Sequence, residues 1–181
     1  MFALVQISRA DLKDGFEPSS LTGDEGRLSI CDSEDREDLT RNFLAWLGFL
    51  VEQSGEYHFE ITTSNKIDRV NFLDMRLFIQ DLDEFSSFLD SSSRLTFELG
   101  FEYDLVKYLF HKSDLYTISY RCVRGNVILS QGSVLSAELR QDCGAFAKQL
   151  YELGARYDPE VVSHGAFQEW YQKVVSRTNT T

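Results

Sequence analysis

The sequence predicts an α+β fold in which a mainly antiparallel sheet packs against helices. Several short segments alternate apolar with polar residues, as strands with one buried face do. Other segments repeat apolar residues at the spacing of a helix face. The connections between the predicted strands are too short for repeated crossover helices, which favours antiparallel pairing over an alternating parallel fold.

The first half of the chain contains two predicted N-terminal strands and one well-marked helix. The strands are FALVQIS (2–8) and RLSIC (27–31), on either side of a polar stretch. The helix follows and ends at Gly55, with Asp32 or Ser33 as its N-cap. Its apolar face consists of Leu39, Phe43, Trp46, Leu47 and Leu50.

The middle of the chain is predicted to alternate strands with one short helix. Residues 56–62 and 72–79 read as strands around a polar turn, and the second of them places Asp74 and Arg76 outward. A helix then begins at Asp81, with Glu84 completing a capping box. The next strand covers 95–103, where Leu95, Phe97, Leu99, Phe101 and Tyr103 face inward.

The last part of the chain is predicted to form a hairpin followed by helices. LVKYLF (105–110) reads as a helical turn, residues 115–122 as a strand, and RGN (124–126) as the turn of a hairpin. A long helix then ends at Gly154, and Asp158-Pro159 opens a final helical region. The predicted core includes Trp46, Phe97, Phe101, Tyr120, Phe146 and Leu150.

The composition is that of a folded protein that does not cross a membrane. Of the 181 residues, 43% are apolar and 13% aromatic, which excludes a disordered chain. We expect a single domain over 1–181, with a boundary near residues 63–68 as the alternative. The chain has no apolar run of about 20 residues and no signal-peptide pattern at MFALVQISR, so we expect a cytoplasmic protein. Cys31, Cys122 and Cys143 are odd in number and far apart, as expected of reduced thiols.

The charge is strongly negative and is concentrated in two places. The net charge is −11, which attracts cationic partners and repels nucleic acid and anionic membranes. In LTFELGFEYDL, Glu98, Glu102 and Asp104 are predicted to share one strand face without a cation among them, although Arg76 or Arg121 on a neighbouring strand would neutralise them. The second group surrounds the start of the first helix and consists of Asp32, Glu34, Asp35, Glu37 and Asp38. We interpret these eight carboxylates as candidate partner-binding residues.

The sequence contains no recognisable catalytic or cofactor motif. It has no nucleophile elbow, phosphate-binding loop, dinucleotide fingerprint or zinc signature. His58, His111 and His164 are each more than fifty residues from the next. We therefore expect no catalytic residue, cofactor or metal, while an enzyme built from scattered residues is an alternative.

In general character the chain resembles the small acidic immunity proteins that bacteria make against polymorphic or contact-dependent toxins. The resemblance lies in size, charge and the order of elements over about residues 57–157, where YTISYRC leads to a hairpin and then to the helix AELRQDCGAFAKQLYEL. It implies a non-enzymatic protein that binds a basic toxin domain, often a nuclease, and blocks its active site or substrate groove.

Two further alternatives come from other classes of function. A phage-type mimic of nucleic acid would place carboxylates where phosphates stand, because outward strand residues two apart are about 7 Å from each other. An assembly or scaffold protein would use an aromatic surface instead. Neither alternative involves direct binding of nucleic acid.

Overall fold

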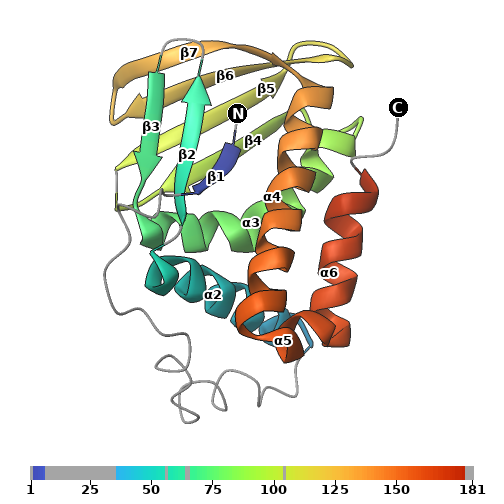
Figure 1. Ribbon diagram of the computed structural model, residues 1–181. Helices are drawn as coiled ribbons and strands as arrows, with labels where there is room; N and C mark the ends of the chain where they lie inside the picture. The colour runs from blue at the N-terminus through green and yellow to red at the C-terminus, as the bar shows by residue number, and fades with distance from the viewer. Residues whose placement is uncertain (1, 7–35, 56, 64–65, 104, 178–181) are drawn as a thin grey trace.

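The computed structural model describes residues 2–6, 36–55, 57–63, 66–103 and 105–177, and for 2–6, 36–38, 63, 66–68 and 72–73 its description is limited to the backbone. The fold is α+β, as predicted, with two antiparallel sheets beside a group of helices (Figure 1). The predicted strand 27–31 and the capping residues Asp32 and Ser33 lie outside the described residues.

The smaller sheet has three strands in the order β1-β2-β3. They are β1 (Phe2–Gln6), β2 (Tyr57–Thr63) and β3 (Lys66–Val70), each antiparallel to its neighbour. Thr63 at the end of β2 is paired with Lys66 at the start of β3. The predicted strands at 2–8 and 56–62 are confirmed over their described residues, 2–6 and 57–62.

The larger sheet has four strands paired in sequence order. They are β4 (Thr96–Phe101), β5 (Val106–Lys112), β6 (Thr117–Arg124) and β7 (Val127–Leu135). The predicted strands at 95–103 and 115–122 are confirmed, and so is the hairpin at 124–126. Gly125 has a φ of 57°, which a glycine adopts without the steric penalty of a side chain.

The helices lie below and beside the two sheets in the view of Figure 1. They are α2 (Arg36–Ser54), α3 (Phe72–Asp90), α4 (Ser136–Tyr157), α5 (Pro159–Ser163) and α6 (Gly165–Ser176). The predicted helices starting near 39 and 136 and the helical region after Asp158 are confirmed, although α4 continues past Gly154 to Tyr157.

The predicted strand at 72–79 is wrong, because these residues form the first half of α3. Leu73, Met75, Leu77 and Ile79 do alternate, but the longer stretch repeats buried residues every three or four positions through Met75, Ile79, Leu82, Phe85 and Leu89. A 19-residue helical pattern prevails over an eight-residue alternation. Asp81 is consequently in mid-helix rather than at an N-cap, and Asp74, predicted to point outward, is completely buried.

Two smaller predictions about the larger sheet are also wrong. Residues 105–110 do not form a helical turn, because 106–110 belong to β5, where Tyr108 and Phe110 are buried at alternate positions. Leu95 and Tyr103 were expected to face the core, but they are 54% and 58% exposed because β4 includes only residues 96–101.

Aromatic side chains join the helices to both sheets. Phe59 of β2 lies 5.0 Å from Phe78 of α3 and 5.3 Å from Phe146 of α4, measured between ring centroids. Phe85 of α3 lies 5.2 Å from Phe97 and 5.0 Å from Phe110 in the larger sheet. All six predicted core residues are buried: Trp46, Phe97, Phe101, Tyr120, Phe146 and Leu150.

Candidate interaction face on the four-stranded sheet

The four-stranded sheet has one covered face and one face that carries polar side chains. Phe97, Phe110 and Tyr120 are paired across β4, β5 and β6 and are buried toward the helices. Because neighbouring strand residues point to opposite sides, the residues between them form an outer face. Its two central rows are Thr96, His111, Ser119 and Ser133, and Glu98, Leu109, Arg121 and Gln131.

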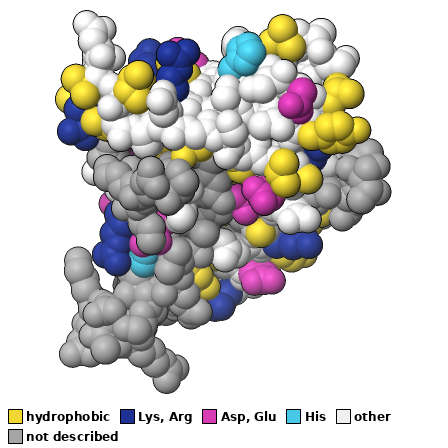
Figure 2. Space-filling view, turned by 90° about the horizontal axis from the view of Figure 1, so that it is seen from above, with side chains coloured by type: hydrophobic (Ala, Val, Ile, Leu, Met, Phe, Trp, Pro, Cys, Tyr) yellow, Lys and Arg dark blue, Asp and Glu magenta, His cyan; other side chains and the backbone are white. Residues whose placement is uncertain are grey.

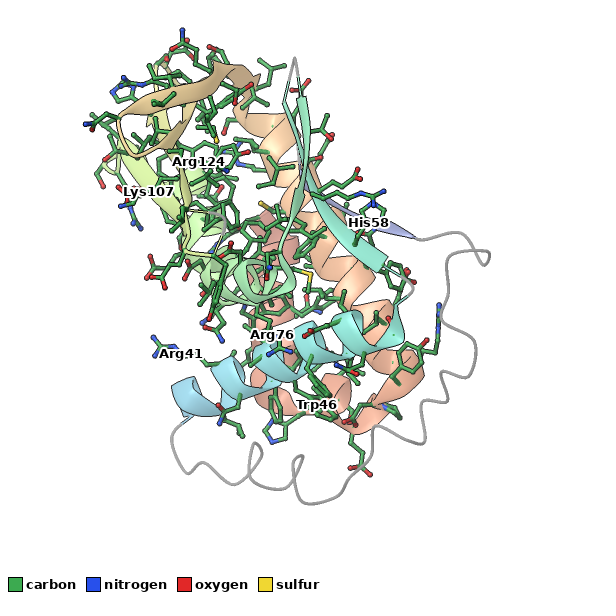
Figure 3. The ribbon with its side chains drawn as sticks, turned by 90° about the vertical axis from the view of Figure 1, so that its left-hand side faces the viewer. Arg41, Trp46, His58, Arg76, Lys107 and Arg124 are labelled. Atoms are coloured by element: carbon green, nitrogen blue, oxygen red, sulfur yellow. The ribbon has the colours of Figure 1, made fainter. Side chains whose placement is uncertain are left out.

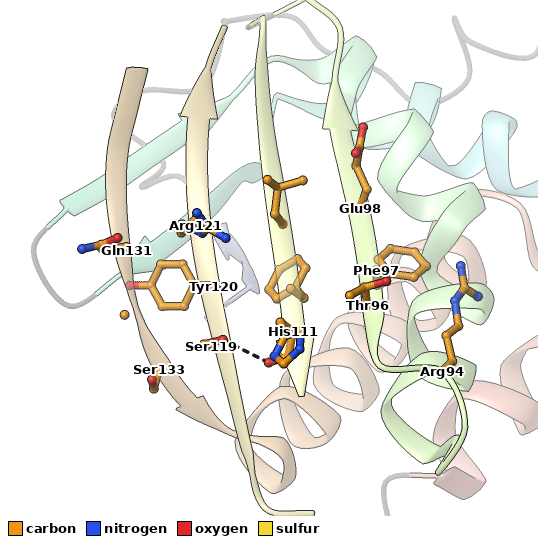
Figure 4. Close-up of a pocket in the computed structure, with 13 residues that line it drawn as sticks. Arg94, Thr96, Phe97, Glu98, His111, Ser119, Tyr120, Arg121, Gln131 and Ser133 are labelled. Carbon is orange, nitrogen blue, oxygen red and sulfur yellow. Dashed lines mark hydrogen bonds between the residues drawn. The ribbon is translucent and has the colours of Figure 1, made fainter. Parts of the chain in front are cut away.

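This outer face is hollowed. A concave space of about 1120 Å³ lies over the two rows and is bordered by Arg94 at the β4 side (Figure 4). Its centre is polar and partly ordered, since the Ser119 hydroxyl donates a hydrogen bond of 3.1 Å to the carbonyl of His111. A twisted sheet presents such a shape as a rigid surface, because its backbone is fixed by the hydrogen bonds between strands.

The charges on this face are mixed rather than uniformly acidic. The Lys107 ammonium group forms an ion pair with Glu98 from the neighbouring strand, and both side chains are more than half exposed. The guanidinium group of Arg94 lies 4.8 Å from the centre of the Phe97 ring. The strand of Glu98 has no cation of its own, and the cation that pairs with Glu98 comes from the neighbouring strand, at Lys107 of β5.

The two expected neutralising arginines do not fill that role. Arg76 is on α3 and forms an ion pair with Glu52 of α2, away from the four-stranded sheet (Figure 3). Arg121 is on β6, which β5 separates from the β4 strand of Glu98. The sequence did not indicate the diagonal pairing of Glu98 with Lys107, because that depends on the register of a strand predicted as a helical turn.

The predicted partner-binding carboxylates are not all on this face. Glu98 is on it, whereas Glu102 is exposed in the turn after β4. Glu37 and Asp38 are in the first turn of α2, in the same region as Arg41, which lies far from Lys107 in Figure 3. Their side chains, and the residues Asp32, Glu34, Asp35 and Asp104 as a whole, lie outside what the structure describes.

Exposed apolar side chains gather around the four-stranded sheet. Among the residues whose side chains are described, every large hydrophobic residue classed as exposed lies between positions 95 and 135. They occur in three places: at the ends of β4, in the β5–β6 turn, and on β7. The nine residues are Leu95, Tyr103, Leu105, Leu115, Tyr116, Val127, Ile128, Leu129 and Leu135.

This apolar rim is the part of the site that sequence reasoning missed. The available signal was the run VIL at 127–129, which places apolar residues on both sides of a strand instead of one. A second signal was Leu115-Tyr116, an apolar pair in a hairpin turn. In Figure 2, viewed from above, hydrophobic groups lie around a largely uncharged surface.

A second hollow, of about 590 Å³, lies between α2, α3 and α6. Its charged lining includes Arg41 and Lys173 as well as Asp81 and Glu84. Burial and the nearby Glu84 raise the pKa of Asp81, while Arg41 acts in the opposite direction. Asp83 and Glu169 also line this hollow, so its four carboxylates outnumber the two cations.

The histidines are separated in the structure as they are in the sequence. His58 lies 2.7 Å from Glu60 on β2, His111 is on the outer face of β5, and Nδ1 of His164 accepts a hydrogen bond from Ala166 N at the start of α6. The described residues contain no group of three or more His, Cys, Asp or Glu that could hold a metal ion. None of the helices described is long and apolar enough to cross a membrane.

Fold and site together define an α+β protein in which the described residues leave one face of a four-stranded antiparallel sheet open, with a polar hollow and an apolar rim. No family model matches the chain, and the comparisons with curated proteins and with solved structures gave no match either.

Proposed function

We propose that this chain is a protein-binding module that recognises its partner with the outer face of the four-stranded sheet. The observation that carries the proposal is the gathering of exposed apolar side chains around that face. Apolar surface exposed to water is unfavourable, and association that covers it is favourable. A few large side chains supply most of the binding energy of protein interfaces, and here such side chains border a polar centre instead of occupying it.

The proposed partner has a net positive charge. The excess of eleven negative charges produces a field that accelerates the approach of a cationic protein. The face itself is mixed, with Glu98 and Lys107 paired and Arg121 two strands away. Such a pattern favours one orientation of the bound partner over others, since like charges brought together are strongly unfavourable.

Within this class, we propose that the chain is an immunity-type protein that neutralises a basic toxin domain by binding it. The immunity function is proposed because the chain resembles such proteins in size, charge and order of elements. The nucleic-acid mimic is supported less well, because the expected row of outward carboxylates on β4 is reduced to Glu98, which is paired with Lys107.

Affinity capture from the source cells tests the proposal. We expect the full chain to retain one cationic protein, and a variant with Leu115→Ser and Tyr116→Ser to retain it at least about tenfold more weakly, because exposed anchors are lost without disturbing the core. Gln172→Ser, an exposed position on α6, is the control and should bind as the wild type does.

Two results would contradict the proposal at different levels. If the wild type, the Leu115→Ser and Tyr116→Ser double variant, and Gln172→Ser all retained the partner equally, the sheet face would not be the binding site. A captured protein that is harmless when produced alone, or whose toxicity is not relieved by co-production of this chain, would exclude the immunity function.

A charge-reversal variant tests the electrostatic part separately. Glu98→Lys together with Glu102→Lys should slow association with the captured protein and reduce its dependence on salt, because charge steering is screened over about 8 Å at physiological ionic strength. The melting temperature should hardly change, since the pair of Glu98 with Lys107 is exposed. Unchanged association with a lowered melting temperature would mean that these carboxylates serve the fold.

A further inference from the structure

The two edges of the four-stranded sheet are protected very differently. β4, at one edge, has six residues, carries Glu98 and is followed by Glu102. β7, at the other edge, has nine residues and contains neither a charged residue nor a proline. Natural edge strands are usually short, charged or interrupted by proline, because an unpaired edge is a template for another strand. β7 has none of these three protections, although a register shift against β6 interrupts its pairing at Leu129.

Within the described part of the chain, β7 pairs with β6 alone and forms the outermost strand in Figure 1. Four of its apolar side chains are exposed: Val127, Ile128, Leu129 and Leu135. A strand that combines a free backbone edge with exposed apolar side chains has the features that strand addition requires.

We infer that the β7 edge binds the β7 edge of a second copy of this chain, so that two four-stranded sheets join into one antiparallel sheet. The sequence of the strand, VILSQGSVL, has apolar residues at both ends and small polar residues in the middle. When two identical strands pair antiparallel, the first residues of one strand lie opposite the last residues of the other. The apolar ends then meet each other, and the polar centres meet as well.

Directly opposed residues of an antiparallel pair share a face of the sheet, so the two-fold axis passes through a residue rather than between two. We place it at Gly132, where the two leucines of the regular segment and its flank come together. A two-fold axis at Gly132 places Leu129 opposite Leu135 of the second copy and Gln131 opposite Ser133, and each of these pairs occurs twice. Gln131 and Ser133 both lie on the outer face, since they pair with Arg121 and Ser119 of β6 (Figure 4). The register shift between Cys122 and Val123 leaves Leu129 without a β6 partner, so the regular part of β7 runs from Ser130 to Leu135 and Leu129 meets Leu135 of the second copy just beyond its end.

Charge favours this edge for contact between two copies. Each chain carries eleven excess negative charges, so two copies repel each other over most of their surfaces. β7 is a stretch of nine residues that adds no charge to the contact. A residue with a side chain would not fit easily at position 132, because a Cβ there would lie only 3.0 Å from the Tyr120 hydroxyl, so the residue at the proposed two-fold axis is a glycine.

Sedimentation and light scattering of the full chain test the inference. We expect a dimer in equilibrium with monomer, and a dissociation constant that Leu129→Lys raises at least about tenfold by placing a cation opposite Leu135. Leu95→Lys is the matched control, because Leu95 is also an exposed leucine but precedes the opposite edge strand. It should dimerise like the wild type, and circular dichroism should show both variants folded.

Disulfide trapping tests the register, in a Cys31→Ser background that leaves the buried Cys122 and Cys143. Opposed residues of an antiparallel pair have Cα atoms about 4.5 to 5.5 Å apart, within the range of a disulfide. A mixture of Gln131→Cys chains with Ser133→Cys chains should therefore cross-link, and neither variant should do so alone. Cross-linking of Gln131→Cys with itself would overturn the register.

A wild-type chain that stays monomeric up to about 1 mM would overturn the dimer itself. If the β7 amides of such a monomer also resisted hydrogen exchange, another part of the same chain would be covering the edge. Equal dimerisation of Leu129→Lys and the wild type would place the contact elsewhere. These outcomes are independent of the toxin-binding proposal, because they need no second protein.

Discussion

The indole Nε1 of Trp46 donates a hydrogen bond of 2.9 Å to Oδ2 of Asp158, across 112 positions of sequence. Both side chains are buried, and the bond connects the middle of α2 to the residue between α4 and α5. Asp158 also precedes Pro159, so the same residue ends one helix and opens the next. The contact therefore fixes the C-terminal helices against α2.

Loss of this hydrogen bond should destabilise the fold. Trp46→Phe retains an aromatic ring but removes the donor, and a buried acceptor that loses a partner costs about 1 to 3 kcal/mol. Asp158→Asn keeps an acceptor oxygen and should lose less. Urea unfolding measures the free energy of unfolding of both variants. If Trp46→Phe lost no more of it than Asp158→Asn, the hydrogen bond would contribute little to stability.

Alanine substitutions at Phe97 and Leu95 should have very different effects on the free energy of unfolding, although the two residues are only two positions apart. Phe97→Ala should lower the free energy of unfolding by about 3 to 5 kcal/mol, because it removes a buried ring that contacts Phe85 and leaves a cavity. Leu95→Ala should change it by less than about 0.5 kcal/mol, since Leu95 is exposed. Similar losses at both sites in chemical denaturation would contradict the placement of β4.

Lys112 should stabilise the C-terminal end of α3. Its Nζ atom donates to the carbonyls of Leu89 and Ser91 and lies 4.9 Å from the centre of the Phe88 ring. Since the last carbonyls of a helix lack partners within the helix and attract cations, Lys112→Met should cost about 1 to 2 kcal/mol. Lys148→Met, at an exposed position of α4, is the control in thermal unfolding and should be neutral.

Asp81 should oppose folding at neutral pH. Burial and Glu84 raise its pKa in the folded protein above the ordinary value of 3.8, so the ionised form is less favourable there than in the unfolded chain. Asp81→Asn should therefore stabilise the protein near pH 7, by less than about 1 kcal/mol because the carboxylate is only partly buried and solvent screens its charge. The gain should disappear as the pH falls through the raised pKa toward 3.8, as melting temperatures over a pH series would record.

Asp114 should behave in the opposite way. Its Oδ1 accepts hydrogen bonds of 2.7 Å from the backbone N–H groups of Tyr116 and Thr117, which lower its pKa. Its contribution to stability is present above the ordinary pKa and is lost as the pH falls through the lowered one. Asp114→Asn should thus lower the melting temperature at pH 7 and have no effect in strong acid. A change of the same sign as that of Asp81→Asn would contradict this reasoning.

Cys143 should be unreactive in the folded protein. Burial raises the pKa of its thiol to about 12, and the thiolate is the reactive form. In a Cys31→Ser chain at pH 8, a thiol reagent should label neither Cys143 nor the buried Cys122 until urea is added, and then both. Mass spectrometry would detect early labelling of the native chain, which would disprove the burial of these thiols.

Several elements could be predicted because their signal is local. The buried side of β6, with Ile118, Tyr120 and Cys122, repeats every two residues, and the face of α4 with Leu139, Cys143, Phe146 and Leu150 repeats every three or four. Each pattern is visible in the sequence because the strand or helix buries only one of its sides. The stretch 72–79 was misread because both periods occur there and only the longer pattern through Phe85 separates them.

The sequence by itself determined the α+β class, most of the strands and helices, the buried aromatic residues and the excess of negative charge, since all of these follow from short periodicities and composition. Tertiary structure decided which side chains meet. It buried Asp74, whose carboxylate accepts a hydrogen bond from Tyr103 N across 29 positions, and it paired Glu98 with Lys107. It also left apolar residues exposed around one sheet. These outcomes depend on strand register and on how α3 packs against β4, and contacts between distant segments have no counterpart in local sequence periodicity.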